Sequence, residues 1–280
     1  MGKRQWLKTH CYTTGDSGPP IILIHGGGMD SAKLSWDRII ENLSHQAQVY
    51  ALDLPGYGQS EYRSGVQYST NFYAHFIKAF MDELKLDKAM VMGLSLGGGV
   101  VLSFTLQFPE RATALGLVGA NGMAKKWEWH FITYHFYVRT PLNRLSLYMM
   151  RKKSFIRTIV KAGLFYKPEN ITDELLDEIY QEALNPHFGR AYESFQRSDY
   201  MGRQGLRSYF GDQMPNIDVP TLIIHGSDDR TIPVDHARRA HKLIPDSELH
   251  IMDECRHWSQ KEYPNEFSQV VGSFISRKLS

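Results

Sequence analysis

The sequence has little cysteine and no long hydrophobic run. Its 280 residues include only two cysteines, Cys11 and Cys255, so we expect neither a disulfide framework nor a cysteine-based zinc site. The longest apolar, strand-like run, Ile21–Ile24, is far too short to cross a membrane. No apolar segment typical of a signal peptide follows Lys3 and Arg4. Together these absences predict a cytoplasmic protein.

A large net charge is also absent. The 32 Lys and Arg residues nearly balance the 30 Asp and Glu residues, and the resulting +2 argues against a dedicated nucleic-acid-binding protein. Hydrophobic residues make up 42% and charged residues 22%, which excludes wholesale disorder. The length fits one large domain, or one domain with an insertion.

Short apolar segments alternate with helical patterns along most of the chain. Between the apolar segments, residues 72–84 and 267–275 repeat apolar side chains at helical spacing. This alternation predicts an α/β fold, with a mostly parallel central sheet and helices on both faces. The segments typical of buried strands are Ile21–Ile24, Val49–Leu52, Ala89–Met92, Leu115–Val118, Thr221–Ile224 and Leu249–Met252.

The alternation stops in the middle of the chain. We predict that residues 122–215 form an inserted helical cap, and that residues 1–121 and 216–280 form the core. The first half of the insertion is basic and aromatic, and an acidic, helix-like stretch, Thr172–Glu182, follows it. Such a basic run is typical of a solvated helix face, here one that the acidic stretch could pair with. Contact with a membrane surface or an acidic ligand is the alternative.

The first catalytic candidate is Ser95, the centre of the sequence Gly-Leu-Ser-Leu-Gly. This motif follows a predicted strand and precedes a helical run, residues 98–107. The glycines at 93 and 97 let the strand and the helix approach closely, as a serine on a sharp strand-to-helix turn requires. The start of the helix also directs N–H groups toward the serine oxygen. The motif alone is weak evidence, but its context makes Ser95 a candidate nucleophile.

A second motif, three glycines after His25, directly follows another predicted strand. The N–H groups of such a loop are unshielded and can donate hydrogen bonds to a developing oxyanion, with the N–H of Leu96 as a further donor. A plain flexible turn is the alternative.

Two acids and one histidine complete the candidates. Asp228 and Asp229 follow a predicted strand, at the end of the sheet where α/β folds place ligands. A turn or helix cap is the alternative for either one. His257 follows the last predicted strand, and it is one of 12 histidines, so its position alone means little. The order Ser95, Asp229, His257, however, is the order of nucleophile, acid and base in one particular fold.

With these motifs, the chain resembles the α/β-hydrolase family with a helical cap, from about Ile21 to Ile275. The resemblance implies that Ser95 is the nucleophile and His257 the base. It also implies that the N–H groups of Gly27 and Leu96 form the oxyanion hole, and that no metal or cofactor takes part.

The family's acid lies three residues after a glycine and four before a proline. Gly226 and Pro233 give this spacing to Asp229 and not to Asp228. The segment Asp53–Ser60 also resembles the family's D-x-x-G-x-G-x-S turn beside the active site. The serine at the nucleophile position argues against the dehalogenases and epoxide hydrolases of this fold, which use a carboxylate.

Within the family, the glycine loop and the dipeptide His257-Trp258 are similar to those of meta-cleavage-product hydrolases, which cut carbon–carbon bonds in dienoic keto acids. This similarity implies substrate contacts from Gly28 and Trp258. That subfamily also has a cap arginine for the substrate carboxylate, and Arg190 and Arg197 are candidates for it. The match is partial, because the glycine loop continues here as Met-Asp-Ser-Ala, residues 29–32.

Our main expectation is a serine esterase acting on a small to medium carboxylic ester through an acyl-enzyme. The alternatives are a carbon–carbon bond hydrolase, a proline-iminopeptidase-like peptidase and a non-catalytic ligand-binding member of the fold. The expected partner is a small-molecule ester or keto acid. We expect no nucleic acid and no stable membrane association, and the sequence leaves a homodimer open.

An aromatic cluster opens the predicted cap. It either lines an apolar substrate pocket or packs between the cap and the sheet. Its members are Trp127, Trp129, Phe131, Tyr134, Phe136 and Tyr137.

Overall fold

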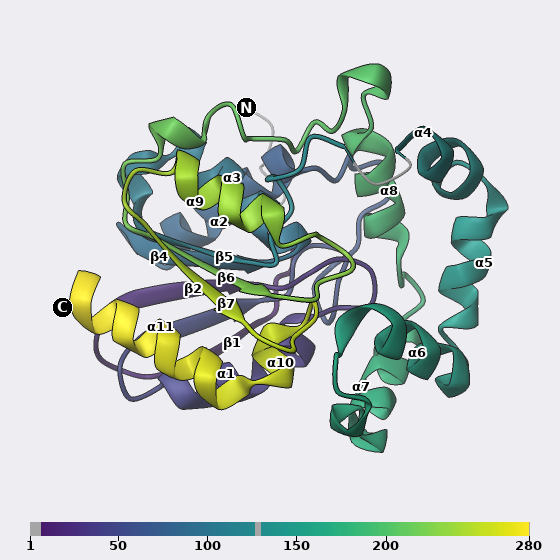
Figure 1. The fold of residues 1–280 in the computed structure, drawn as a ribbon, viewed down its shortest axis with the longest axis horizontal. Helices are drawn as coiled ribbons and strands as arrows, with labels where there is room; N and C mark the ends of the chain where they lie inside the picture. Colours follow the sequence, from purple (N-terminus) through teal and green to yellow (C-terminus); the bar gives the residue numbers. More distant parts are fainter. Residues whose placement is uncertain (1–6, 127–129, 280) are drawn as a thin grey trace.

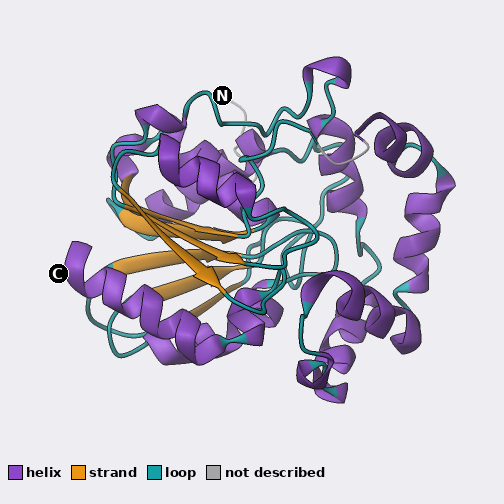
Figure 2. Cartoon of the chain, viewed as in Figure 1, coloured by secondary structure: helices purple, strands orange, loops and turns teal. Residues whose placement is uncertain are grey.

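The computed structural model of the chain describes residues 7–126 and 130–279. Its centre is one seven-stranded sheet with the strand order β1-β3-β2-β4-β5-β6-β7. Figure 2 shows this sheet with helices on both sides of it. All neighbouring strands are parallel except β1, which runs antiparallel to β3. The strands are β1 Cys11–Thr14, β2 Pro20–Ile24, β3 Gln48–Leu52, β4 Ala89–Leu94, β5 Ala112–Val118, β6 Thr221–Gly226 and β7 Ser247–Met252.

The strands that the sequence predicts are all present. The central parallel strands are covered on both faces and therefore consist of continuous apolar residues, whereas the edge strand β7 is only partly buried. Every residue of β4 and of β6 is buried. The sequence analysis missed β1, whose residues Cys-Tyr-Thr-Thr form a partly exposed edge strand without an apolar run.

Helices cover both faces of the sheet, as predicted (Figure 1). One face packs against α1 Ala32–Leu43, α10 Ser259–Glu262 and α11 Pro264–Lys278, and the other against α2 Thr70–Glu83, α3 Leu96–Gln107 and α9 Asp235–Leu243. Ser31 and Ser69 begin α1 and α2, where each side chain accepts a hydrogen bond from a backbone N–H of the first turn. A short 3₁₀ turn, Pro109–Arg111, leads into β5.

The predicted helical cap is inserted between β5 and β6. Its described residues form the helices α4 His130–Ile132, α5 Pro141–Met149, α6 Lys153–Ile159, α7 Asp173–Ala183 and α8 Arg190–Asp199. Two π-helical turns, Thr133–Val138 and Val160–Leu164, and three 3₁₀ turns, Pro168–Asn170, Gly202–Gln204 and Met214–Asn216, complete it. The exact cap boundaries at residues 122 and 215 stay a prediction.

The acidic stretch of the sequence is α7, and it pairs with the basic α6. Arg157 contacts Asp173 at 2.6 Å, and Lys153 forms an ion pair with Asp177. These exposed pairs contribute little to stability, but they account for part of the basic run. Among the described residues, no helix is both long and apolar enough to cross a membrane.

Candidate functional site

The candidate nucleophile lies on a strained turn between β4 and α3. Ser95 has a φ of 52° and a ψ of −115°, a region that side chains rarely occupy. Close packing enforces this turn. A Cβ on Gly93 would lie 2.2 Å from the carbonyl oxygen of Gly97, and one on Gly97 would lie 2.4 Å from that of Ile24. The two glycines of the motif are therefore required by the backbones that meet here.

The glycine loop runs beside this turn, after β2. A Cβ on Gly26 would lie 3.5 Å from Cβ of Ser95, and one on Gly27 would lie 3.2 Å from the side chain of Leu96. The two predicted oxyanion-hole residues are therefore neighbours. The buried ring of His25 supports the loop, because its Nδ1 donates to the carbonyl oxygen of Gly26 at 2.7 Å while its Nε2 accepts from a backbone N–H at 3.0 Å.

The buried carboxylate of Asp30, which the sequence analysis did not single out, forms hydrogen bonds to the glycine loop and to the start of α1. Asp30 accepts hydrogen bonds from the N–H of Gly26 at 2.7 Å, the N–H of Ser31 at 2.9 Å and the hydroxyl of Ser35 at 2.6 Å. Burial raises the pKa of Asp30 above its ordinary value, and the three hydrogen bonds and His25 oppose that rise. The only sequence signal was the departure from the subfamily's loop at residues 29–32.

The acid and the base of the predicted triad are hydrogen-bonded to each other. Nδ1 of His257 lies 2.7 Å from Oδ2 of Asp229, and both side chains are buried. The other oxygen of Asp229 accepts from the N–H groups of Thr231 at 2.8 Å and Ile232 at 2.9 Å, which fixes the plane of the carboxylate. Burial alone would raise the pKa of Asp229, but His257 and His225 outweigh it and hold that pKa well below its usual range.

The neighbouring Asp228 has different surroundings. Its side chain is exposed and accepts a hydrogen bond from the hydroxyl of Ser227 at 2.6 Å. Of the two candidate acids, the one that the Gly–Pro spacing selects is thus the one that contacts His257.

The end of β5 brings the nucleophile and the base to the same place. The N–H of Ser95 donates to the carbonyl oxygen of Val118 at 2.9 Å. The next residue, Gly119, approaches the base so closely that a Cβ there would lie 3.1 Å from Nδ1 of His257. Within the described ranges, the hydroxyl of Ser95 is not hydrogen-bonded to any group, so the structure joins the base to the acid but not to the nucleophile.

Arg256, Trp258 and Glu262 connect the loop of His257 to the cap. The guanidinium of Arg256 donates to the carbonyl oxygen of Phe165 at 3.0 Å. The buried Glu262 accepts from the N–H groups of Tyr166 at 2.8 Å and Arg256 at 3.1 Å. Trp258, a predicted substrate contact, is buried with its ring edge-on to Phe165. The base therefore lies where core and cap are joined.

A tyrosine of α8 covers the glycine loop, and the sequence analysis missed it. A Cβ on Gly27 would lie 2.6 Å from the ring of Tyr192, and one on Gly28 would lie 3.8 Å from it. Burial raises the pKa of Tyr192 to about 12, so its hydroxyl stays protonated at neutral pH. The residue could not be found from sequence because which helix faces the loop depends on the packing of the cap.

The aromatic cluster of the cap is placed differently from either prediction. Phe131 and Phe136 expose 63% and 64% of their surface, so the prediction that they line a pocket or pack on the sheet is wrong. Tyr134 stacks on Tyr200 with ring centroids 3.5 Å apart. Trp127 and Trp129 lie outside the described residues.

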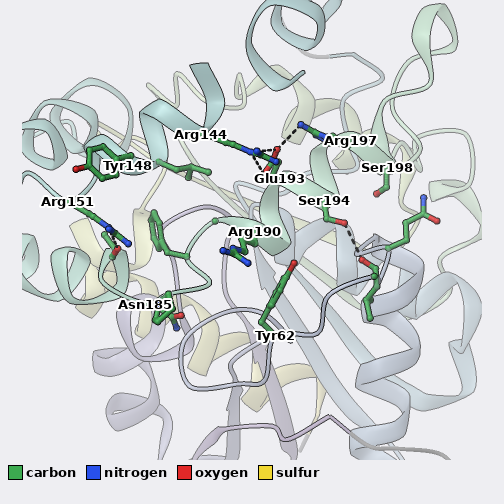
Figure 3. A pocket seen from close by; sticks show the side chains of 18 residues that line it. Tyr62, Arg144, Tyr148, Arg151, Asn185, Arg190, Glu193, Ser194, Arg197 and Ser198 are labelled. Atoms are coloured by element: carbon green, nitrogen blue, oxygen red, sulfur yellow. Dashed lines mark hydrogen bonds and ion pairs between the residues drawn. The ribbon is translucent and has the colours of Figure 1, made fainter. Parts of the chain in front are cut away.

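The predicted cap arginines line a separate groove of about 940 Å³, between α5, α8 and residues 62–67 (Figure 3). Arg197 contacts Glu193 at 2.7 Å, and Glu193 also contacts Arg144 at 3.3 Å. Arg190 is exposed and lies 6.0 Å from the ring centre of Tyr62. Ser95, Asp229 and His257, all described, are not among the lining residues.

Glu182, a partly buried carboxyl group of α7, predicts a pH-dependent stability. Burial raises the pKa of Glu182 to about 7, with Asp53 and Asp30 adding to the rise and Ser31 and Lys33 opposing it. The folded chain therefore binds a proton more tightly than the unfolded chain. This contribution to stability is complete below about pH 4.5 and is lost as the pH rises through about 7.

We expect Glu182→Gln to remove this dependence. Between pH 5 and pH 8, the unfolding free energy of the parent chain should fall by on the order of 2 kcal/mol more than that of the variant. Urea unfolding at both pH values measures the difference. Glu174→Gln, an exposed position on the same helix, is the control and should behave as the parent. Parallel pH profiles for parent and Glu182→Gln would contradict the prediction.

Among the described residues, no group of three or more His, Cys, Asp or Glu side chains is arranged to hold a metal ion.

Comparison with known proteins gives the family. Residues 19–264 match the model of the alpha/beta hydrolase fold. A curated relative, the 2-hydroxy-6-oxo-2,4-heptadienoate hydrolase of Pseudomonas putida, is 28% identical over 96% of this chain and 93% of its own. The meta-cleavage product hydrolase of Pseudomonas fluorescens IP01 has a similar structure, with a TM-score of 0.81, 28% identity and coverage of 97% and 95%.

An esterase from Thermogutta terrifontis also aligns, with a TM-score of 0.80 over 100% of this chain and 97% of its own. At 22% identity it shares the fold alone. The family model spans well over half of the sequence. The chain belongs to the alpha/beta hydrolase fold family, and its similar proteins include meta-cleavage product hydrolases.

Proposed function

We propose that this hydrolase cleaves the carbon–carbon bond beside a ketone in a dienoic keto acid, using Ser95, His257 and Asp229. The observation that supports the catalytic residues is the 2.7 Å contact between His257 and Asp229, at the sheet end where the strained Ser95 turn also lies. The relatives that act on such keto acids favour this substrate class over the ester that the sequence analysis ranked first.

In the proposed reaction, the hydroxyl oxygen of Ser95 attacks the ketone carbon and Nε2 of His257 takes its proton. Asp229 keeps the proton of His257 on Nδ1 and stabilises the imidazolium that forms. The N–H groups of Gly27 and Leu96 donate to the oxyanion, and each such donor typically contributes about 10²–10³ in turnover.

The bond between the ketone carbon and the dienoate then breaks. Before this step the proton of the 2-hydroxyl group moves to the carbon beside the ketone, so that the electron pair of the broken bond is delocalised onto the resulting 2-oxo group. The dienolate so formed takes the proton from His257, and the acyl group stays on Ser95. His257 next removes a proton from water, the resulting hydroxide attacks the acyl carbon, and the Ser95 oxygen leaves with the proton of His257 as the carboxylic acid is released. The hydrogen bond between Ser95 and His257 forms in this scheme when substrate binds, as catalytic hydrogen bonds commonly do.

The substrate carboxylate needs a cationic partner, and Arg190 suits that role better than Arg197. Glu193 already neutralises Arg197, whereas Arg190 has an aromatic neighbour, Tyr62, and no carboxylate among its described contacts. We retain Arg190 as the proposed contact, together with Gly28 and Trp258. Because Arg190 lines the groove that lacks Ser95, Asp229 and His257, this contact requires a substrate that extends toward that groove.

Ester hydrolysis stays the second candidate because of one specific observation. No lysine or arginine is fully buried anywhere in the described part of the chain. The cation proposed for the substrate carboxylate, Arg190, is exposed and lines a groove that does not include Ser95, whereas an ester with a neutral acyl group needs no such cation.

A direct comparison of two substrate classes tests the proposal. We expect kcat/KM for 2-hydroxy-6-oxo-2,4-heptadienoate, followed by the loss of its conjugated absorbance, to exceed that for p-nitrophenyl acetate and butyrate by at least about 100-fold. Acetate should appear in equal amount to the keto acid consumed. If the p-nitrophenyl esters were hydrolysed and the keto acid were left intact, the proposal would be wrong and the chain would be an ester hydrolase.

A further inference from the structure

The outward side of the first half of the cap is apolar and has no cover in the described part of the chain. Six side chains of α4, the following π-helical turn and α5 expose at least half of their surface. We call this set the outer cap face: Phe131 63%, Ile132 50%, Phe136 64%, Leu142 54%, Leu145 53% and Tyr148 61%. A soluble domain rarely gathers this many exposed large apolar side chains in one short segment without a binding role.

The arrangement of α5 explains why these residues face outward. Leu142, Leu145 and Tyr148 are three residues apart and therefore lie on one side of the helix. The opposite side is buried, where Asn143 donates a hydrogen bond to Gln196 of α8 at 3.2 Å. Figure 1 shows α8 between α5 and the core, with α4 and α5 at the edge of the molecule farthest from the sheet.

The charge of the longer segment that contains the outer cap face and continues through α6 has one sign. Residues 130–168 contain no Asp or Glu, although the whole chain has a net charge of only +2. Four of the cations, Arg139, Arg151, Lys152 and Lys161, are exposed and have no carboxylate partner in the described ranges. The complete set is Arg139, Arg144, Arg151, Lys152, Lys153, Arg157, Lys161 and Lys167.

Cationic and apolar side chains are interleaved on this surface. The guanidinium of Arg151 lies 5.7 Å from the ring centre of Tyr148, and both side chains, like that of Arg144, also line the groove between α5, α8 and residues 62–67. Arg144, which follows the exposed Leu142 by two residues, has 71% of its side chain exposed while it contacts Glu193. Long basic side chains beside aromatic and aliphatic groups fit the boundary between lipid phosphates and acyl chains, where the cations reach the phosphates and the apolar groups insert.

We propose that the outer cap face binds reversibly to the surface of a bilayer that contains anionic lipids. The cations supply the attraction to phosphate, and the apolar side chains supply the insertion. An acidic protein would match the cations but leave the exposed Phe131, Phe136 and Leu145 without a matching partner. The proposal concerns peripheral contact by one face, and it does not depend on the reaction proposed above.

Vesicle co-sedimentation of the full chain tests the proposal. We expect binding to vesicles of phosphatidylcholine with about 30 mol% phosphatidylserine at about 0.1 M salt, and much weaker binding to phosphatidylcholine alone. Raising the salt to about 0.5 M should weaken the binding further, because the charges are then screened. Absence of binding to the anionic vesicles at the lower salt concentration would overturn the proposal.

Two double variants locate the surface. Arg139→Gln/Lys152→Gln should lower the partition coefficient at least tenfold, because each cation near an anionic surface contributes roughly fivefold. Leu142→Ser/Leu145→Ser should also lower it. The matched control is Lys88→Gln/Lys242→Gln, which removes the same charge from exposed core positions and should bind as the parent. If the control lowered the partition coefficient as much, net charge alone would explain the binding and the proposal would be overturned.

Self-association is the alternative to membrane binding: a second copy of the chain could bind to the outer cap face. We expect sedimentation velocity to give the same oligomeric state for the parent and for Leu142→Ser/Leu145→Ser. A parent dimer that this variant dissociates would assign the face to self-association instead. Turnover of a soluble substrate should be unchanged in every variant, so failure to bind vesicles and failure of the proposed reaction are separate outcomes.

Discussion

Ser95→Ala should lower kcat by about 10⁵–10⁶-fold and leave the fold intact. Loss of a serine nucleophile removes the covalent step, and the remaining oxyanion donors and binding contacts provide only a small part of the rate. In the described part of the chain the Ser95 hydroxyl makes no hydrogen bond, so we expect the free energy of unfolding to change by no more than about 0.5 kcal/mol. Steady-state kinetics and urea unfolding measure the two quantities.

The control is Ser227→Ala, a serine on the loop after β6 whose hydroxyl bonds to Asp228. Its kcat should stay within about twofold of the parent. A fluorophosphonate probe should add its mass to the peptide that contains Ser95 in the parent and not in Ser95→Ala. Retention of more than about a tenth of the parent rate by Ser95→Ala would exclude Ser95 as the nucleophile.

The sheet and the loops of the site could be predicted from sequence because they depend on local patterns. A buried parallel strand such as Ala89–Leu94 is a continuous apolar run, and the turn after it leaves room for glycine alone at positions 93 and 97. Likewise, the spacing between Gly226 and Pro233 selected Asp229 over Asp228, and Asp229 is the acid that contacts His257. The pattern that predicts each feature lies within a short stretch of sequence, although the group that requires glycine at position 97 is the carbonyl oxygen of Ile24 on another strand.

The cap could not be predicted in the same way. Its aromatic residues have helical spacing, but spacing does not tell which side of a helix meets the core and which meets the surroundings. Phe131 and Phe136 were therefore predicted either to line a pocket or to pack between the cap and the sheet, although they face outward. Tyr192, whose ring lies against Gly27, had no signal in the sequence, because only the packing of α8 on the core brings it there.

Buried polar supports were missed for a related reason. Asp30 binds three donors around the glycine loop, and Glu262 binds the backbone on both sides of the junction between cap and core. Each looks like an ordinary surface acid in the sequence. A buried carboxylate is stable only when its hydrogen bonds are satisfied, and the partners are distributed over loops that come together only in the folded chain.

Asp229→Asn should lower kcat by about 10⁴-fold, and the cause lies in the direction of the new amide. The N–H groups of Thr231 and Ile232 both donate to Oδ1 of Asp229, so the asparagine carbonyl oxygen must take that position. Its NH₂ group then faces Nδ1 of His257, where Oδ2 now accepts at 2.7 Å. This forces the proton of His257 onto Nε2, and the ring can no longer take the proton of Ser95.

The adjacent acid supplies the matched control for this variant. Asp228→Asn changes the same chemical group one residue away, on an exposed side chain that contacts only the hydroxyl of Ser227 among its described side-chain partners. We expect its kcat to stay within about twofold of the parent at every pH at which the parent is folded. If Asp228→Asn were the inactive variant, or if Asp229→Asn kept more than about a tenth of the parent rate, the hydrogen bond between Asp229 and His257 would be structural, and the base would need another partner.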